Sequence, residues 1–216
     1  KVLKKHQVTP ENDHISIIFA LLHKIKHVDF SVYKKATIGR RIERRMVALK
    51  VTTLSEYIAL IERDEQEVEL LYKDILIGVT SFFRDRDAYN SLENLLDKYL
   101  DEIPDAKELR IWMPGSSTGE EAYSVAIILN ELLNDRQNNL DLKIFATDID
   151  EDALKTARQG IYSQASMTEV SDAYIKDYFT ITDNEFEVKK TLRQNIVFSY
   201  HNLLSDPPFK DLDLIV

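Results

Sequence analysis

The chain has 216 residues, of which 44% are hydrophobic and 30% are charged, with five glycines, five prolines and no cysteine. This composition is typical of a globular protein and excludes disordered, collagen-like and low-complexity chains. No apolar run approaches the ~20 residues that a membrane span requires, and without cysteine there are no disulfides, thiol nucleophiles or cysteine-ligated metal sites. We expect a cytoplasmic protein without membrane insertion.

The first residues carry no periodic pattern. The chain begins with Lys1 rather than Met, and KVLKKHQVTP precedes the first helical pattern. We expect residues 1–13 to be a linker, or the start of a fragment cut from a longer polypeptide.

Residues 14–78 are predicted to form a small helical domain. The first helix is indicated by apolar residues that recur every three or four positions: Ile15, Ile18, Leu22 and Ile25. Two further short helices are expected over residues 55–62 and 64–76.

Between them, Thr37 is expected to be the N-cap of a strongly basic helix. Its predicted buried stripe consists of Ile38, Ile42, Met46 and Leu49. Its basic residues are Arg40, Arg41, Arg44 and Arg45.

The charge of the chain is unevenly distributed. The net charge of −9 argues against nucleic-acid binding through bulk charge. Residues 24–50, however, hold nine basic and two acidic residues, a local charge of +7 that leaves −16 for the rest. Such a basic island favours a docking surface for an acidic partner, and a solvated helix face is the alternative.

The segment before the predicted sheet reads Gly-Val-Thr-Ser-Phe-Phe-Arg-Asp over residues 78–85. Because Phe82 and Phe83 are adjacent, we expect at least one of them to meet the other domain or a ligand. Arg84 offers a planar donor fork to a carboxylate. The alternative is an interdomain plug with a surface pair of Arg84 and Asp85.

From residue 109 onward, strand and helix patterns alternate, which predicts an α/β fold with a parallel, Rossmann-like sheet. The pattern places strands and helices alternately over residues 109–113, 120–133, 142–147 and 150–158, with further strands over 196–200 and 212–216. An insertion of about 160–195 contains a hairpin around Asp183 and Asn184, that is, a small β-subdomain. The sheet is expected to be truncated at its C-terminal side, because a bare apolar edge strand would expose unpaired backbone groups.

Ligands of such sheets bind beyond the carboxyl ends of the strands. After the first strand, Gly115 and Gly119 would let a ligand approach the backbone. Glu120 and Glu121 would repel a pyrophosphate at the helix N-terminus, which favours a positively charged ligand such as S-adenosylmethionine. A capping box between Thr118 and Glu121 is the alternative that needs no ligand.

Two further strand ends carry polar residues. Asp148 stands where a carboxylate would accept the two hydroxyl groups of a ribose. Asp148 or Asp150 could instead cap the next helix, and Asp150 is the better candidate. Asn202 would offer amide donors and acceptors to adenine or to a reacting group.

Taken together, six sequence blocks resemble the CheR-type chemotaxis receptor methyltransferases. They are Phe30-x-x-Tyr33 with Thr37-Ile-x-Arg-Arg-Ile-x-Arg-Arg-Met46, Leu76-Ile-x-Val-Thr-Ser-Phe-Phe-Arg-Asp85, Arg110-Ile-Trp-x-x-Gly-x-Ser-Thr-Gly-Glu-Glu-x-Tyr-Ser124, Ala146-Thr-Asp-Ile-Asp150, Ala157-Arg-x-Gly-Ile-Tyr162 and His201-Asn-Leu-Leu204. The resemblance runs in order from about residue 30 to the end. It identifies residues 79–216 as an S-adenosylmethionine-dependent methyltransferase domain.

The resemblance implies transfer of a methyl group to glutamate side chains on the acidic helical signalling region of a chemoreceptor, leaving S-adenosylhomocysteine. The implied cofactor contacts are Thr80, Arg84, Glu121, Asp148, Asn202 and Leu203. Arg84 would reach the methionine carboxylate and border the methyl-transfer site, and Glu121 would hold the ammonium group. The basic helix with Arg40, Arg41, Arg44 and Arg45 would grip the receptor.

The chain departs from the family pattern in three ways. Pro114 and Ser116 stand where small residues and often cysteine occur, and Gly78 stands where some members have an asparagine that touches the cofactor. The family's Cys-Arg-Asn motif after the fourth strand is absent. The alternative is therefore a regulatory module that binds cofactor or receptor helix without turnover. The blocks also resemble the methyltransferase part of methylesterase fusions.

The expected chemistry requires no metal and no general base, since a glutamate carboxylate is already ionised at neutral pH. A nucleotide- or small-molecule-modifying methyltransferase is a weaker rival, and we expect a monomer. Some relatives bind a receptor-tail pentapeptide at the insertion through a longer, glycine-bearing hairpin loop. Because residues 180–185 contain no glycine, we predict that this chain works without such a tether.

Overall fold

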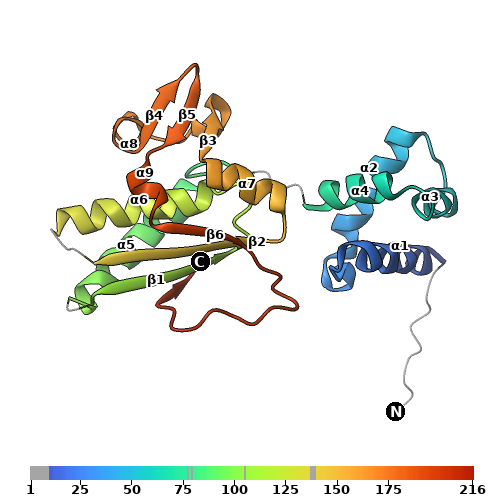
Figure 1. Cartoon of the computed structure of the whole chain (residues 1–216), viewed down its shortest axis with the longest axis horizontal. Helices are drawn as coiled ribbons and strands as arrows, with labels where there is room; N and C mark the ends of the chain where they lie inside the picture. The colour runs from blue at the N-terminus through green and yellow to red at the C-terminus, as the bar shows by residue number, and fades with distance from the viewer. Residues whose placement is uncertain (1–9, 77, 79, 105, 137–139) are drawn as a thin grey trace, which may run out of the picture. The chain divides into compact units, whose positions relative to one another are not determined.

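The computed structural model describes residues 10–76, 78, 80–104, 106–136 and 140–216. It divides into two units, one that ends before Gly78 and one that runs from Gly78 to Val216 (Figure 1). We refer to them as unit 1 and unit 2 and describe each by itself.

Unit 1 is helical, as the sequence predicts. Its elements are α1 (Pro10–Lys26), the short 3-10 helix η1 (Phe30–Val32), α2 (Lys35–Leu49), α3 (Leu54–Ile61) and α4 (Glu65–Leu76). Its fully buried side chains include Ile18, Leu22, Phe30, Ile38, Ile42, Tyr57 and Leu71. These residues recur at helical spacing, so each helix turns one apolar face toward a shared core.

Helix α2 begins earlier than predicted. The carbonyl of Lys34 accepts the N–H groups of Thr37 (2.9 Å) and Ile38 (3.3 Å), so Lys34 is the N-cap residue. The prediction of Thr37 as N-cap is wrong because Thr37 already lies in the first turn. Ile38 and Ile42 are buried as predicted, whereas Leu49 at the helix end is 37% exposed.

Unit 2 contains an open sheet of four parallel strands in the order β6–β2–β1–β7. The strands are β1 (Glu108–Pro114), β2 (Asp141–Asp148), β6 (Ile196–Tyr200) and β7 (Leu214–Ile215). In the chain, β2 and β6 follow β1 in one direction, and β7 then lies on the other side of β1. The strand order therefore reverses beside β1, where α/β folds bind their ligands.

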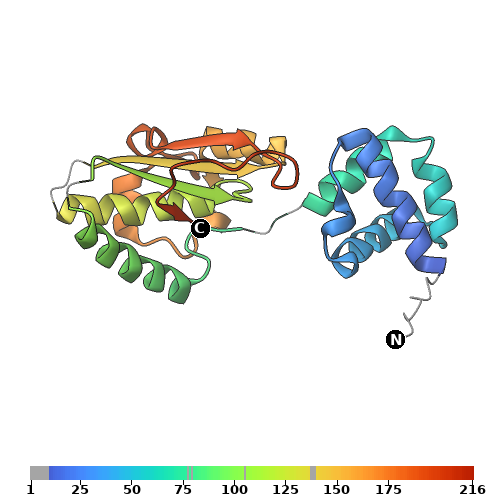
Figure 2. The same cartoon turned by 90° about the horizontal axis from the view of Figure 1, so that it is seen from below.

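Three longer helices belong to this sheet: α5 (Arg86–Glu102), α6 (Glu120–Asp135) and α7 (Glu151–Gln159). Figure 2 shows α5 and α6 together on one face of the sheet. Helix α5 was missed in the sequence, although the side chain of Asp85 caps it and Leu92, Leu96 and Leu100 recur every four residues. The predicted α/β architecture is confirmed.

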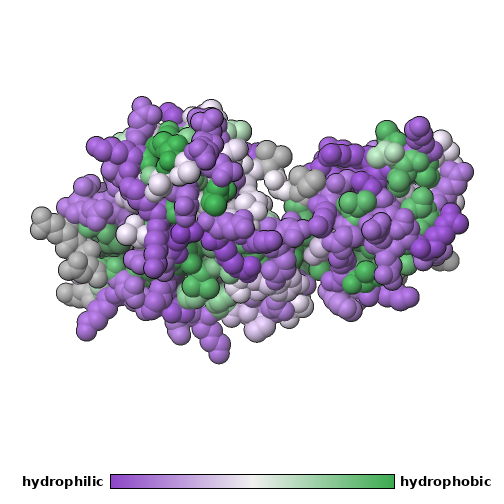
Figure 3. Space-filling model, turned by 45° about the horizontal axis from the view of Figure 1, so that its top comes forward, coloured by the Kyte–Doolittle hydropathy of each residue, from purple (hydrophilic) through white to green (hydrophobic). Residues whose placement is uncertain are grey.

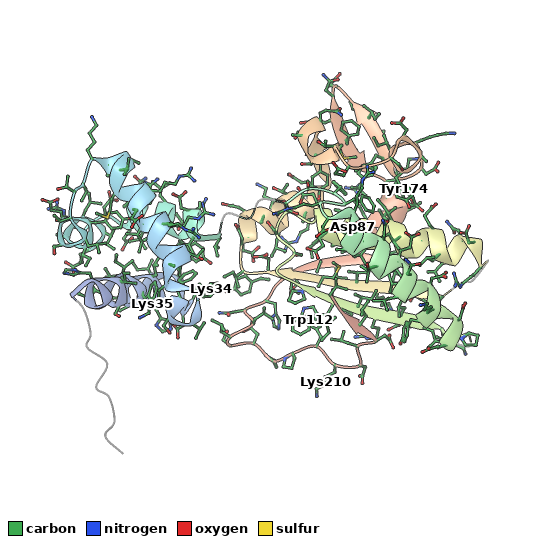
Figure 4. The ribbon with its side chains drawn as sticks, turned by 180° about the vertical axis from the view of Figure 1, so that it is seen from behind. Lys34, Lys35, Asp87, Trp112, Tyr174 and Lys210 are labelled. Atoms are coloured by element: carbon green, nitrogen blue, oxygen red, sulfur yellow. The ribbon has the colours of Figure 1, made fainter. Side chains whose placement is uncertain are left out.

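The segment between β6 and β7 covers the opposite face of the sheet. The ring of Phe209 packs on Phe145 (centroids 5.1 Å apart) and on Trp112 (5.3 Å). Figure 4 shows Trp112 between the sheet and the segment that carries Lys210. Both faces of the sheet therefore exclude water over its central strands.

The insertion forms a second, antiparallel sheet in the order β3–β5–β4. Its elements are β3 (Ile161–Ser163), the 3-10 helix η2 (Gln164–Met167), α8 (Asp172–Tyr178), β4 (Phe179–Thr182), β5 (Glu185–Val188) and α9 (Lys190–Arg193). Asp183 and Asn184 both have positive φ (47° and 66°), as a two-residue type I′ turn requires. Figure 3 shows apolar surface on this part of unit 2, where Ile161 and Ile181 are exposed.

Phe82 and Phe83 are both buried in the core of unit 2. Phe82 packs against Tyr162 (4.9 Å between centroids) and Phe83 against Tyr174 (5.5 Å). The expectation that one ring meets the other domain or a ligand is wrong. It assumed regular backbone, whereas Phe83 has a left-handed φ of 50° that turns both rings into one core.

Candidate functional site

The loop after β1 is held at the end of β2. The N–H groups of Gly115 and Ser116 both donate to the carbonyl of Thr147, at 2.7 and 2.9 Å. Gly115 has a φ of 77°, and a Cβ there would meet no atom within 4 Å. The open space beside Gly115 agrees with the predicted approach of a ligand to the backbone.

Gly119 has a different role from the one predicted. A Cβ at this position would lie 2.9 Å from Cβ of Ala157 and 3.1 Å from the ring of Phe198, and its φ is 92°. The glycine is therefore needed so that the start of α6 can pack against α7 and β6, and the prediction of ligand approach at Gly119 is wrong.

The two glutamates that begin α6 point to different environments. Glu120 is buried and accepts a hydrogen bond from Oγ1 of Thr118 (2.6 Å). The N-cap residue is Gly119 and no side chain caps the helix, so the alternative of a capping box between Thr118 and Glu121 is wrong. Glu121 is exposed and free of that structural role.

Two cavities adjoin this helix start. The smaller, of about 220 Å³, is lined by residues that include Thr80, Arg84, Ser116 and Glu121. The larger, of about 460 Å³, lies between α5 and α6 and shares Arg84, Glu121 and Tyr89 with the first. A cation and a carboxylate thus border the same space, which suits a ligand that carries both an anionic and a cationic group.

Asp148 connects this loop to the next strand end. Its Oδ2 accepts the N–H of Ser117 (2.8 Å), and its Oδ1 accepts that of Asp150 (2.9 Å). Asp150 is the N-cap of α7 and accepts from the N–H groups of two residues in its first turn. The capping role therefore belongs to Asp150, and Asp148 remains available at the ligand edge of the sheet.

Asn202 and Leu203 lie one strand further along this edge. Asn202 is buried, and its Oδ1 accepts the N–H of Leu204 (3.0 Å). Leu203 is 57% exposed. The N–H of His201 donates to the carbonyl of Asp148 (3.0 Å), which joins the ends of β6 and β2. Of the six predicted cofactor residues, three line one cavity and three follow the edge beyond it.

One buried polar atom at this edge supports the fit of a ligand. Within the described parts of the chain, the buried side-chain atoms without a hydrogen-bond partner are Oγ of Ser116 and Nδ1 of His201. Ser116 lines the smaller cavity, whereas the ring of His201 packs against Trp112 and Phe209. An unsatisfied buried polar group is costly unless a ligand or water completes it. The carboxyl end of β1 therefore fits a polar ligand such as S-adenosylmethionine.

Tyr89 on α5 is a cavity residue that the sequence did not reveal. It borders both cavities. Burial, and secondarily the charge of Glu121, raises the pKa of Tyr89 to about 12, so its hydroxyl is protonated at neutral pH. Finding it would have required the prediction of α5 and of its orientation against α6.

The arginines of α2 divide into two groups. Arg40 and Arg44 are exposed, and Arg41 is half-buried. Arg45 donates to both carboxylate oxygens of Glu67 on α4, from Nε at 2.9 Å and from Nη2 at 2.5 Å. Glu67 is only 3% exposed, so Arg45 is engaged within unit 1 rather than in the predicted docking surface.

Two negative observations concern the described residues only. There, no group of three or more metal-ligating side chains is arranged to hold an ion. In the same residues, no helix is both long and apolar enough to cross a membrane.

Comparison with known families divides the chain at the same place as the structure. The family model described as "CheR methyltransferase, all-alpha domain" matches residues 13–76. The one described as "CheR methyltransferase, SAM binding domain" matches residues 78–216, which include all six predicted cofactor residues.

Several curated proteins are similar over most of the chain. A chemotaxis protein methyltransferase of Borreliella burgdorferi is 31% identical over 94% of this chain and 75% of its own length. One of Listeria monocytogenes is 31% identical over 88% of this chain and 70% of its own length. An uncharacterised 104.1 kDa protein of Rhodobacter capsulatus is 37% identical over 92% of this chain, which spans only 21% of that protein. With both of its units matched, this chain belongs to the CheR methyltransferase family.

Proposed function

We propose that this chain methylates glutamate side chains of a chemoreceptor, using S-adenosylmethionine, in a bacterial chemotaxis-type signalling system. The observation that carries the proposal is the pairing of Arg84 and Glu121 around one cavity, next to the carboxylate of Asp148. The relatives named chemotaxis protein methyltransferase support the reaction class. A substrate of this kind places the reaction in the cytoplasm.

Different residues of unit 2 would bind different parts of the cofactor. Arg84 would hold the carboxylate of its methionine part, Glu121 the ammonium group and Asp148 the ribose hydroxyls. Thr80, Asn202 and Leu203 would complete the contacts along the strand ends. When bound, S-adenosylmethionine supplies an electrophilic methyl group, which passes to a carboxylate oxygen as the carbon–sulfur bond breaks and the thioether is left.

The protein itself has little proton chemistry to perform. A glutamate substrate is ionised at neutral pH, so no side chain has to remove a proton from it. The contribution of the protein is orientation, because the attacking oxygen must lie in line with the bond that breaks. Arg84, at the border of both cavities, is the residue that we assign to steering the substrate carboxylate.

The receptor would be recognised through unit 1. Arg40 and Arg44 are exposed on α2 within the segment of charge +7, which suits an acidic helical partner. Arg45 is omitted from this surface because of its bond to Glu67.

Two assays test the proposal. Titration of this chain with S-adenosylhomocysteine measures cofactor binding, and incubation with receptor signalling fragments and methyl-labelled cofactor measures transfer. A glutamate methyl ester releases methanol in base, which a methylated amine does not. Binding of the cofactor without any ester on a panel of receptors would support the regulatory alternative, and absence of cofactor binding would contradict the proposed methyltransferase activity.

A matched pair of variants locates the site. Arg84→Ala should weaken S-adenosylhomocysteine binding by about ten- to a hundredfold, since charge-assisted hydrogen bonds are lost. Arg86→Ala removes a neighbouring arginine that pairs with Glu169 at the surface (2.8 Å), and it should leave binding unchanged. Equal effects of the two substitutions on binding would show that Arg84 does not contact the cofactor.

A further inference from the structure

The backbone at Phe83 has an unusual conformation for a bulky residue next to the proposed cofactor site. Phe83 has a φ of 50°, a region that bulky side chains rarely adopt, and it is only 7% exposed. Such conformations persist only where the surrounding structure holds them, and they cluster at functional sites. Arg84 is the next residue, so the conformation of Phe83 sets the direction in which the chain presents Arg84.

One side chain holds this backbone. The N–H of Phe83 donates to Oγ of Ser124 (3.2 Å), and the same hydroxyl donates to the carbonyl of Glu120 (2.7 Å). Ser124 is 0% exposed. Because its hydrogen is committed to Glu120, a lone pair of Oγ is left to accept the N–H of Phe83. The hydroxyl is thereby bonded on both sides, and the side chain of Tyr89 on α5, which borders both cavities, also interacts with it.

Ser124 lies on the same helix as Glu121. The two are three residues apart on α6 and therefore lie on neighbouring positions of one helix face. Helix α6 thus carries Glu121, one charged residue of the proposed site. Through the hydroxyl of Ser124, the same helix also holds the segment that contains Arg84. The aromatic ring of Phe83 adds a second anchor at Tyr174 of the insertion, which is labelled in Figure 4.

From this arrangement we infer that Ser124 is a positioning residue that fixes the distance between Arg84 and Glu121 by clamping the left-handed turn at Phe83. The inference rests on the proposed function, in which these two charges hold the carboxylate and the ammonium group of one amino-acid moiety. A ligand with both charges at a set spacing is bound tightly only if the protein charges keep that spacing.

The first test separates the amino-acid part of the ligand from the rest. In Ser124→Ala, affinity for S-adenosylhomocysteine should fall by about three- to tenfold, which lies within the range of one lost coupling between neighbouring groups. Affinity for methylthioadenosine, which lacks the amino-acid part, should not change. Equal losses for both ligands, or no loss for either, would overturn the inference.

A matched control comes from the preceding residue of α6. Tyr123→Phe also removes a buried hydroxyl, one that donates to the carbonyl of Ala157 (2.8 Å), but it leaves the N–H of Phe83 bonded. It should lower the melting temperature without changing either affinity. A selective loss of S-adenosylhomocysteine affinity in this control would show that any buried hydroxyl of α6 has the same effect.

A double substitution tests whether Ser124 acts through Arg84. If it does, Ser124→Ala should cause no further loss of affinity in an Arg84→Ala background, whereas a packing role would multiply the two losses. Hydrogen exchange of the ligand-free chain provides an independent readout. Ser124→Ala should speed exchange at residues 82–85, and unchanged exchange there would overturn the clamp even if the chain proved not to bind the cofactor.

Discussion

At the scale of single residues, Asp148 combines two roles: it binds backbone N–H groups of the protein, and it is proposed to bind the ribose of the cofactor. Its two oxygens each accept a backbone N–H, one from the loop after β1 and one from Asp150. A carboxylate has about four lone-pair sites, so two remain for the hydroxyl groups of a ribose. A substitution at Asp148 must therefore be compared with one that alters only the local turn.

Asp148→Asn should lower the affinity for S-adenosylhomocysteine by about ten- to a hundredfold, roughly 1.5–3 kcal/mol, because charge-assisted hydrogen bonds to the ribose are lost. The measurement is isothermal titration of the chain. The control is Asp150→Asn, which should keep full affinity, since Asn caps helices about as well as Asp. An unchanged affinity in Asp148→Asn would show that Asp148 does not bind the ribose.

Residues at strand ends and helix starts could be predicted from the sequence as members of the site, whereas Ser116 and Tyr89 could not. Glu121 and Asp148 directly follow apolar strand patterns or begin a helix, and strand ends converge at one edge of a parallel sheet. Ser116 and Tyr89 belong to residue types that occur at many surface positions. The role of Gly119 depends on a 2.9 Å approach to Ala157, a tertiary distance that no local pattern contains.

At the scale of elements, α2 presents arginines on two different faces. Ile38 and Ile42 fix the buried face, and Arg45 lies close enough to it to reach Glu67 on α4. The hydroxyl of Tyr57 on α3 donates to the same carboxylate (2.9 Å). The bond to Glu67 raises the pKa of Arg45, so this guanidinium stays charged. Three helices of unit 1 therefore meet at one buried carboxylate.

Arg45→Ala should destabilise unit 1 by about 3–5 kcal/mol, because it leaves the charge of Glu67 buried and unpaired. Arg44→Ala, a change of the same size at an exposed position, should alter the free energy of unfolding by less than about 0.5 kcal/mol. Denaturant unfolding followed by circular dichroism measures both values. Similar values for the two variants would mean that the Arg45–Glu67 pair contributes nothing to the stability of α2.

Periodicity predicted the elements better than their boundaries. The strands of the parallel sheet and the helices of unit 1 appear where alternating or helical patterns place them, because burial on one face imposes those periods. The start of α2 was misplaced, since Thr37 and Lys34 both allow a helix to begin and a carbonyl contact decides between them. Helix α5 was not predicted, although Leu92, Leu96 and Leu100 recur at helical spacing.

At the scale of the whole molecule, charge separates the two proposed tasks. The segment of +7 belongs to unit 1, whereas the proposed cofactor site belongs to unit 2. Substitutions on the exposed face of α2 can therefore change receptor recognition and leave cofactor binding intact. This separation makes the docking proposal testable by itself.

Arg40→Ala combined with Arg44→Ala should slow receptor methylation and weaken its dependence on salt, because fewer charges steer the encounter. Affinity for S-adenosylhomocysteine should stay the same. Added salt should slow the unchanged chain in the same way, since screening acts over about 8–10 Å at these ionic strengths. The control, Arg40→Lys with Arg44→Lys, keeps the charge and should keep most of the rate. Normal methylation by the alanine variant at low and high salt would show that these two arginines take no part in receptor recognition.

The last prediction concerns recruitment of the chain to its substrate. In β-augmentation, a sheet edge gives a peptide its backbone hydrogen bonds, and neighbouring side chains form the pockets that select its sequence. Strand β4 is a four-residue edge of the small sheet, so backbone groups are available there. The connection to β5 is only the turn at Asp183 and Asn184, which leaves no loop to form such pockets.

We therefore expect no sequence-specific binding of a receptor-tail pentapeptide, and equal methylation rates for receptors with and without that tail. Fluorescence titration of the labelled pentapeptide, with a scrambled peptide as control, measures the first, and methyl incorporation measures the second. Micromolar binding of the pentapeptide alone, abolished by Ile181→Asp on β4, would show that the edge suffices without a loop. Recruitment would then depend on the insertion as well as on Arg40 and Arg44, and the two arginine substitutions should slow methylation less for a tailed receptor than for a tailless one.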